Sequence, residues 1–186
     1  MKTGQRLRSD DEIGADSSTA GDGASLVGVK IRFRIGVRGS GPEFEACHIE
    51  RLLDRSAAVI VRDGKIVGEA ANTVTTSNDP TAHGEVNAIR AAAKALGTFT
   101  LAGCELYTSC EPCPMCLAAA YWARIDAIYY GASAADAARS GFDDAFLYEE
   151  LRKDHGARSL PSTQLLGDEA WSSFAAWMTS PNKIDY

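Results

Sequence analysis

The residues in this sequence best suited to chemistry lie between Thr81 and Cys116. This stretch opens with His83-Gly84-Glu85 and closes with Pro112-Cys113-Pro114-Met115-Cys116. A catalytic zinc ion takes imidazole nitrogen and thiolate sulfur from three protein ligands and leaves its fourth position to water. His83, Cys113 and Cys116 form such a set, so we predict that they bind Zn2+.

Glu85 follows His83 by two residues and is left free to move protons. Zinc lowers the pKa of its bound water to about 7. A carboxylate beside that water can take its proton, pass it to a ring nitrogen and protonate departing ammonia. We therefore predict that Glu85 is the catalytic residue of a hydrolytic deamination. The motif H-x-E followed by P-C-x-x-C is typical of zinc deaminases that act on nucleobases. The alternative is a first-turn carboxylate that the helix dipole stabilises.

Two other interpretations of the cysteine pair fit less well. A structural zinc site uses four protein ligands, usually as two Cys/His pairs. The remaining cysteines and histidines form no second pair: Cys47, His48, Cys104, Cys110 and His155. A redox C-x-x-C pair would not need His83 and Glu85 upstream.

The composition is that of an ordinary globular protein. Of 186 residues, 45% are hydrophobic and 24% charged, and the formal net charge is −6. No apolar run approaches the roughly 18 residues that cross a bilayer, so we expect no membrane partner. Phosphate binding needs clustered Lys and Arg, so we expect no nucleic-acid partner either. Five cysteines without an even framework indicate the reducing cytoplasm.

The chain divides into a tail and one domain. Residues 1–25 are rich in Gly, Ser, Asp and Thr, which predicts a disordered tail, and residues 26–186 form a single predicted deaminase domain. Alternation predicts a strand over 27–37, and an apolar side predicts a helix over 43–55. Asp63-Gly64 predicts a hairpin turn between strands at 57–61 and 66–70.

Strands and helices alternate after this hairpin. We expect helices over 82–96, from the end of a loop at 111–114 to about 124, over 132–140 and over 168–178. We expect strands over 104–108, 125–130 and, as an edge strand, 164–166. This order predicts an α/β domain whose mixed sheet is covered on both faces. Val86, Ile89, Ala93 and Leu96 fall on one core face, and Trp171, Phe174 and Trp177 on another. Tyr121 and Trp122 are interpreted as core or dimer-interface aromatics.

From Ala57 to Tyr186 the sequence resembles the cytidine-deaminase-like superfamily and, within it, the bacterial guanine deaminases. The resemblance rests on four segments: residues 75–83, 106–116, 121–124 and 141–144. It implies a three-layer α/β/α fold with a five-stranded sheet, and a homodimer whose C-terminal segment crosses to cap the partner's site. It also places substrate binding at Asn72, Asp144 and the terminal Tyr186.

The sequence departs from this family in two places. Gly84 stands where the family usually has alanine, and the stretch 30–56 lacks the family's Gly-Gly-Pro-Phe-Gly loop. The residues themselves leave alternatives open at two of the substrate positions. Asn72 could be a turn residue, and Asp144 a helix cap or a solvated acid.

The resemblance implies deamination of a purine base, most directly guanine to xanthine and ammonia. Alternative substrates of the same chemistry are cytosine, a nucleoside or an aminotriazine. A tRNA adenosine deaminase carries the same zinc signature, but would be expected to have a basic groove. An alternative of another class is a non-catalytic, zinc-stabilised dimer or binding module, which the presence of Glu85 disfavours.

Overall fold

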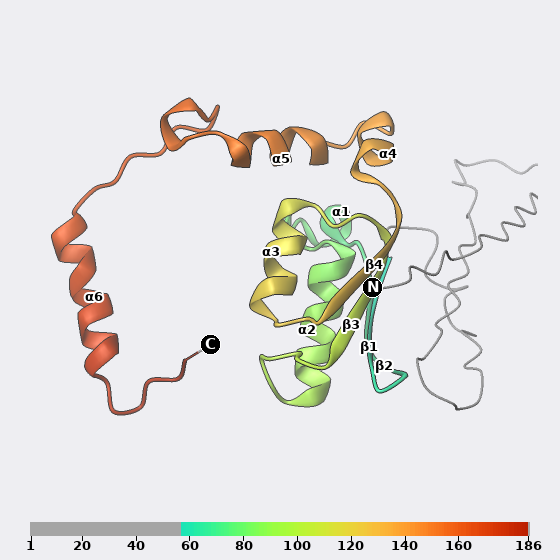
Figure 1. Ribbon diagram of the computed structural model, residues 1–186, viewed down its shortest axis with the longest axis horizontal. Helices are drawn as coiled ribbons and strands as arrows, with labels where there is room; N and C mark the ends of the chain where they lie inside the picture. The colour runs from blue at the N-terminus through green and yellow to red at the C-terminus, as the bar shows by residue number, and fades with distance from the viewer. Residues whose placement is uncertain (1–56, 186) are drawn as a thin grey trace, which may run out of the picture.

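The structure is a computed structural model that describes residues 57–185 (Figure 1). Its centre is a mixed sheet with strand order β2-β1-β3-β4. The strands are β1 (Ala57–Arg62), β2 (Lys65–Ala71), β3 (Cys104–Cys110) and β4 (Ala127–Ala132). The helices are α1 (Val74–Ser77), α2 (Gly84–Leu96), α3 (Pro114–Trp122), α4 (Ala134–Arg139), α5 (Asp144–Arg152), the 3-10 helix η2 (His155–Ala157) and α6 (Gly167–Thr179). The sheet has four strands in this part of the chain, whereas the sequence predicts five.

The pairing of the strands confirms a mixed α/β sheet. β1 pairs antiparallel with β2 and with β3, whereas β4 lies parallel to β3 after the crossover through α3. Asp63 and Gly64 turn the β1–β2 hairpin with positive φ angles of 50° and 71°, as the predicted Asp-Gly turn requires. The ends of β3 and β4 therefore point the same way, toward the starts of the neighbouring helices.

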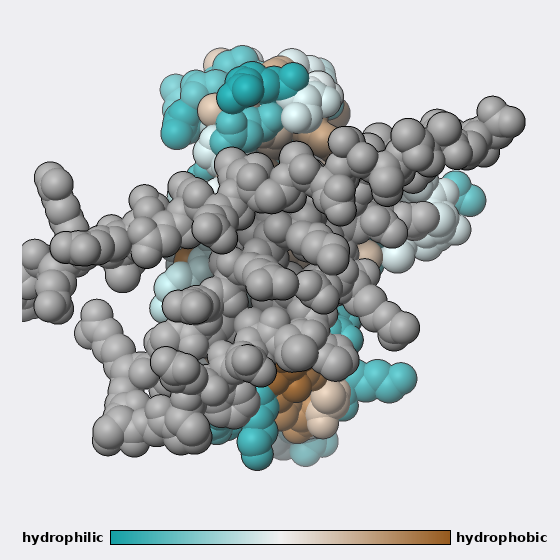
Figure 2. Space-filling model, turned by 90° about the vertical axis from the view of Figure 1, so that its right-hand side faces the viewer, coloured by the Kyte–Doolittle hydropathy of each residue, from teal (hydrophilic) through white to brown (hydrophobic). Residues whose placement is uncertain are grey.

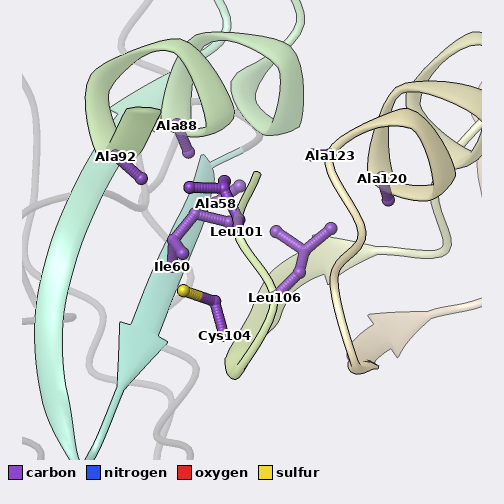
Figure 3. Packing of buried hydrophobic residues seen from close by; sticks show 9 residues of the cluster. All are labelled: Ala58, Ile60, Ala88, Ala92, Leu101, Cys104, Leu106, Ala120 and Ala123. Atoms are coloured by element: carbon purple, nitrogen blue, oxygen red, sulfur yellow. The ribbon is translucent and has the colours of Figure 1, made fainter. Parts of the chain in front are cut away.

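One face of the sheet carries the main core. Ala58 and Ile60 of β1 and Leu106 of β3 are fully buried beneath Ala88 and Ala92 of α2 (Figure 3). Ala120 and Ala123, in and just after α3, complete the same cluster. Small alanines let the helix approach the sheet closely. The predicted face of α2 is confirmed in part: Ile89, Ala93 and Leu96 pack against the core, but the fully buried apolar residues of the helix are Ala88 and Ala92.

The other face of the sheet holds a second buried cluster. It consists of Val59, Val61 and Tyr107, which alternate with the core residues along β1 and β3. Tyr107 also stacks on Tyr129 of β4, with ring centroids 4.7 Å apart. Both faces therefore carry buried apolar side chains. The described helices of the main core, α2 and α3, lie on the first face.

The chain beyond residue 144 leaves the sheet as a C-terminal arm, which we define as residues 144–185. In Figure 1 the arm runs along α5 and then away to α6, which stands apart from the sheet. Trp171, Phe174 and Trp177 were predicted to face the core, and this prediction is wrong for the single chain. Their exposed fractions are 60%, 62% and 41%, because α6 does not reach the core of its own chain.

One side of α5 faces the body, and the exposed remainder carries both charged and apolar residues. Glu149 and Arg152 form an exposed ion pair, whereas Asp144 and Tyr148 are half-buried. Figure 2 shows the molecule from the right-hand side of Figure 1, with mainly hydrophilic described residues at the upper end and a small hydrophobic area lower down. The first helix of the arm is thus attached to the body through one side only.

The predicted strands and helices can be compared with the described ones. The hairpin, β3, β4 and helices α2, α3, α4 and α6 are confirmed, with ends that shift by a few residues. Residues 164–166, predicted as an edge strand, form no strand pairing within the described chain. Helices α1 and α5 were not predicted. The predicted tail over 1–25, strand over 27–37 and helix over 43–55 lie outside the described residues. None of the described helices is long and apolar enough to span a membrane.

Candidate active site

Two helix starts meet at the carboxyl end of β3 and bring the predicted metal ligands together. His83 is the N-cap residue of α2, and Cys113 is the N-cap residue of α3. Cys116 lies in the first turn of α3 and is fully buried. The ligand atoms of these three residues all lie within 4.8 Å of one another. They come together because the hydrogen-bonded sheet places the two helices side by side.

The distances within this group fit a tetrahedral zinc centre. His83 Nδ1 lies 3.6 Å from Cys113 Sγ and 3.5 Å from Cys116 Sγ. With Zn–N of about 2.05 Å and Zn–S of about 2.3 Å, a tetrahedral centre separates nitrogen from sulfur by about 3.6 Å. One nitrogen and two sulfurs make three ligands, which is the number typical of a catalytic site with an open fourth position.

The two thiols differ in acidity. The hydrogen bond from Cys116 lowers the pKa of Cys113 to about 6, and the backbone N–H groups of Cys116 and Met115 act in the same direction. The same thiol–thiol bond, together with burial, raises the pKa of Cys116. One thiolate is therefore available at neutral pH, and the second thiol releases its proton when a metal binds.

Glu85 lies beside the ligands in the first turn of α2. Its carboxylate is buried, with an exposed fraction of 7%. Thr108 of β3 donates a hydrogen bond of 2.7 Å to Glu85 Oε1, and Cys116 Sγ lies 3.4 Å from Oε2. A buried carboxylate needs such donors. The bond from Thr108 fixes the carboxylate so that Oε2 faces the metal ligands.

Asn72 lies in the loop between β2 and α1. Its side-chain oxygen accepts a hydrogen bond of 3.0 Å from the backbone N–H of Val74, which is the turn role. Asn87 of α2 holds the same loop, because its Nδ2 lies within 3.2 Å of Ala71 O, Thr73 Oγ1 and Ala82 O. The turn role leaves the amide nitrogen of Asn72 available for a second contact.

Asp144 approaches the site from the start of α5. Burial raises its pKa, the charge of His83 lowers it, and the charge of Glu85 raises it again. The charges of His83 and Glu85 thus both act on the Asp144 carboxyl. Helix α5, which the sequence did not predict, carries this carboxyl group in its first turn.

The sequence comparison identifies the family. Residues 54–132 match the family described as "Cytidine and deoxycytidylate deaminase zinc-binding region". Over 129 residues the chain is 56% identical to the guanine deaminase of Bacillus subtilis (strain 168). The aligned region covers 69% of this chain and 83% of that protein. The chain belongs to this zinc deaminase family. Zinc is thus its cofactor, and the three ligands above form its metal site.

Solved structures and a further relative extend the comparison. The X-ray structure of the Bacillus subtilis guanine deaminase matches at 55% identity with a TM-score of 0.68, and the match covers 70% of this chain and 83% of that chain. The tRNA-specific adenosine deaminase of Agrobacterium fabrum (strain C58 / ATCC 33970) is 48% identical over 75 residues. This match covers 40% of the present chain and 49% of that protein. Similarity to the tRNA enzyme is therefore confined to about half of its length.

The sequence motifs located the metal ligands and Glu85 of this zinc deaminase, but not their supports. Thr108 was missed, although a polar residue two positions after Leu106, on the same apolar face of β3, is a usable signal. Asn87 was missed as well, and its only signal is a polar residue one helical turn after His83. Tyr186, which the resemblance assigned to substrate binding, lies outside the described residues.

Proposed function

We propose that this zinc deaminase converts guanine to xanthine and ammonia. The observation that carries the proposal is the joint placement of His83, Cys113 and Cys116 around one point with Glu85 buried beside them. Similarity to a guanine deaminase over most of both chains supports guanine as the substrate. Cytosine, a nucleoside or an aminotriazine would undergo the same chemistry and remain outcomes of the test.

Glu85 is the proposed catalytic residue. Bound zinc supplies a Lewis acid that lowers the pKa of water to about 7. Glu85 Oε2 faces the ligands, so it is placed to move two protons in turn. The first would pass from water to the substrate's ring nitrogen, and the second from the hydroxyl group added to the ring carbon to the leaving amine. Thr108 holds the opposite oxygen, Oε1, at 2.7 Å, which keeps Oε2 directed at the site through both transfers.

Two further side chains are proposed to orient the base. The amide of Asn72 can donate to a ring or carbonyl acceptor while its own oxygen stays bound to Val74 N. The carboxyl of Asp144 can accept from a ring N–H or an amino group, and the influence of His83 and Glu85 on its pKa supports this role. Together they would read the donor and acceptor pattern of a purine edge.

We further propose that the enzyme is a homodimer in which the C-terminal arms are exchanged. The apolar residues of α6 are exposed in one chain, and a large uncovered apolar face is typical of an interface. The exposed Tyr121 and Trp122 of α3, at 72% and 61%, offer a complementary apolar surface. Residues 164–166 have no strand pairing within one chain. They are therefore available to add a fifth strand at the β4 edge of the partner's sheet.

In this arrangement Tyr186 covers the partner's site, and the sheet gains the third layer of the α/β/α fold. A terminal aromatic residue would exclude water and strengthen the polar contacts inside. A cytoplasmic location suits the enzyme, because two free thiols must stay reduced to bind the metal. No nucleic-acid partner and no membrane partner are expected.

The deciding experiment measures ammonia release by purified zinc-loaded protein from a panel of bases and nucleosides, with guanine, cytosine, cytidine, adenosine and an aminotriazine. We expect guanine to have the highest kcat/KM and Glu85→Gln to abolish turnover with zinc retained. A transfer RNA arm assays inosine formation. A higher kcat/KM for another compound of the panel would make that compound the substrate in place of guanine. Inosine formation would favour tRNA adenosine deamination. Ammonia release from no substrate would favour the non-catalytic module.

A further inference from the structure

A hydrogen bond joins the C-terminal arm to the loop that carries the metal ligands. Tyr148 of α5 donates its hydroxyl hydrogen to the backbone carbonyl of Pro112 over 2.7 Å. Tyr148 is half-buried and Pro112 is buried. The two residues are 36 positions apart, so this bond depends on the packing of α5 against the body.

The backbone of this loop has little freedom apart from the peptide group that Tyr148 binds. Pro112 and Pro114 flank Cys113 and fix their own φ angles. Cys113 has extended backbone angles, with φ −62° and ψ 166°, as the N-cap residue of α3. The main remaining rotation before Cys113 is therefore ψ of Pro112, which turns the peptide plane between Pro112 and Cys113. A hydrogen bond to the carbonyl oxygen of Pro112 fixes that plane.

The other end of the loop is anchored independently. Glu111 donates its backbone N–H to Ala132 O over 2.7 Å, and its carboxylate accepts a bond of 2.8 Å from Ala134 N. These bonds tie the loop to the end of β4 and the start of α4. They do not hold the peptide group between Pro112 and Cys113, whose carbonyl oxygen is bound by Tyr148.

We infer that Tyr148 is a positioning residue for the zinc site, acting through the Pro112–Cys113 peptide group. The inference rests on the zinc site of the proposed function, but not on which base is deaminated. Asp144 lies one helical turn before Tyr148 on α5, so the same helix places the substrate-binding carboxyl and the ligand loop. The arm is thereby linked to the metal centre: a displacement of α5 moves both.

The chemistry of the tyrosine suits a permanent donor. Burial raises the pKa of Tyr148, and the Glu111 carboxylate acts in the same direction. The phenol therefore keeps its hydrogen at neutral pH. Replacing it by phenylalanine removes only the donor and keeps the ring that packs between α5 and the loop.

The test compares Tyr148→Phe with Tyr130→Phe, a matched change on the half-exposed strand β4. Zinc transfer to a chromophoric chelator is timed, and the thiolate-to-metal and d–d bands of the cobalt-substituted protein are recorded. Loss of one net hydrogen bond should speed zinc release by about three- to tenfold in Tyr148→Phe, with altered cobalt bands and unchanged secondary structure. Tyr130→Phe should match the wild type in both measurements.

A second variant separates positioning from general packing. Pro112→Ala frees φ at the carbonyl that Tyr148 binds, keeps that carbonyl and leaves α5 untouched. We expect faster zinc release in Pro112→Ala and a double variant whose effect is smaller than the product of the two, because both loosen the same peptide. Wild-type release and cobalt bands in Tyr148→Phe would overturn the inference. If Tyr148→Phe fails to fold, wild-type behaviour of Pro112→Ala would overturn it. Neither readout depends on the substrate.

Discussion

Thr108 donates its hydroxyl hydrogen to Glu85 over 2.7 Å, from the middle of the sheet to the first turn of α2. Both residues are buried, with exposed fractions of 2% and 7%. The strand thus supplies a fixed donor to the carboxylate that must move protons at the site. This bond is the most direct contact between the core of the fold and the proposed chemistry.

Replacing Thr108 should therefore slow catalysis more than it weakens binding. Thr108→Val keeps the side-chain volume but removes the donor, and a hydrogen bond to a charged group is worth about 1.5–3 kcal/mol. We expect kcat to fall by about tenfold to a hundredfold, with KM and zinc content close to wild type. Thr108→Ser keeps the hydroxyl and should recover most of the rate. Steady-state kinetics with zinc analysis would contradict this role if valine and serine were equally active.

Gly68 of β2 should tolerate no side chain. A Cβ at this position would lie 2.6 Å from the backbone nitrogen of Ala92 and 2.7 Å from the carbonyl oxygen of Ala88. Helix α2 would have to move away from the sheet, which typically costs about 1–3 kcal/mol. We expect Gly68→Ala to lower the urea midpoint of unfolding and also kcat/KM, because α2 carries His83 and Glu85.

The control for this prediction is Gly156→Ala in η2, where an added Cβ would meet nothing within 4 Å. It should leave both the urea midpoint and kcat/KM near wild type. A Gly68→Ala protein as stable as the control would show that α2 does not depend on this close approach.

Glu150 should make the stability of the arm depend on pH. The ion pair with Lys153 lowers the pKa of Glu150 to about 2, and hydrogen bonds from the backbone N–H and hydroxyl of Ser159 act in the same direction. Because the folded pKa lies below the unfolded value of about 4.3, this stabilisation is present above that value. It is lost as the pH falls from there toward 2.

Hydrogen exchange measures this effect locally. At pH 7 the amide of Ser159 should have a higher protection factor in the wild type than in Glu150→Gln, and the difference should shrink toward pH 2. Glu149→Gln removes a neighbouring exposed carboxylate and serves as the matched control. A difference that does not change with pH would exclude the charge of Glu150 as its cause.

Removing Lys183 to Tyr186 should impair catalysis without removing zinc. The Nζ of Lys183 lies 4.8 Å from the centroid of the Trp177 ring, so the tail starts against α6, which stands apart from the sheet in Figure 1. If the tail covers the partner's site, the truncated dimer should lose at least about tenfold in kcat/KM, or about 1.4 kcal/mol. Unchanged kinetics would make the tail a frayed end.

Mixed dimers identify the chain on which the tail acts. The truncated protein keeps a complete metal site but lacks the tail, and Glu85→Gln lacks the acid but keeps the tail. In an exchanged dimer, the Glu85→Gln chain supplies the tail to the intact site of its truncated partner. Mixing should then raise the activity above that of either parent. If the tail acts on its own chain, the mixed dimer should be no more active than the truncated parent.

The sequence by itself determined the local chemistry of this protein. Cys113 and Cys116 lie within one helical turn, as do His83 and Glu85, so short-range spacing alone fixes which side chains meet at each helix start. The Asp63-Gly64 turn is equally local, because it depends on backbone conformations available to those two residues. Such features need no knowledge of the rest of the chain.

Only the tertiary structure decided how distant parts of the chain combine. The bonds from Thr108 to Glu85 and from Tyr148 to Pro112 join residues 23 and 36 positions apart, and nothing in local spacing specifies such pairs. The structure also decided that Trp171, Phe174 and Trp177 lie outside the core of their own chain. The periodicity of α6 correctly predicted an apolar face. Periodicity reports only which side of a helix avoids water, because burial depends on the surface that the rest of the assembly brings against it.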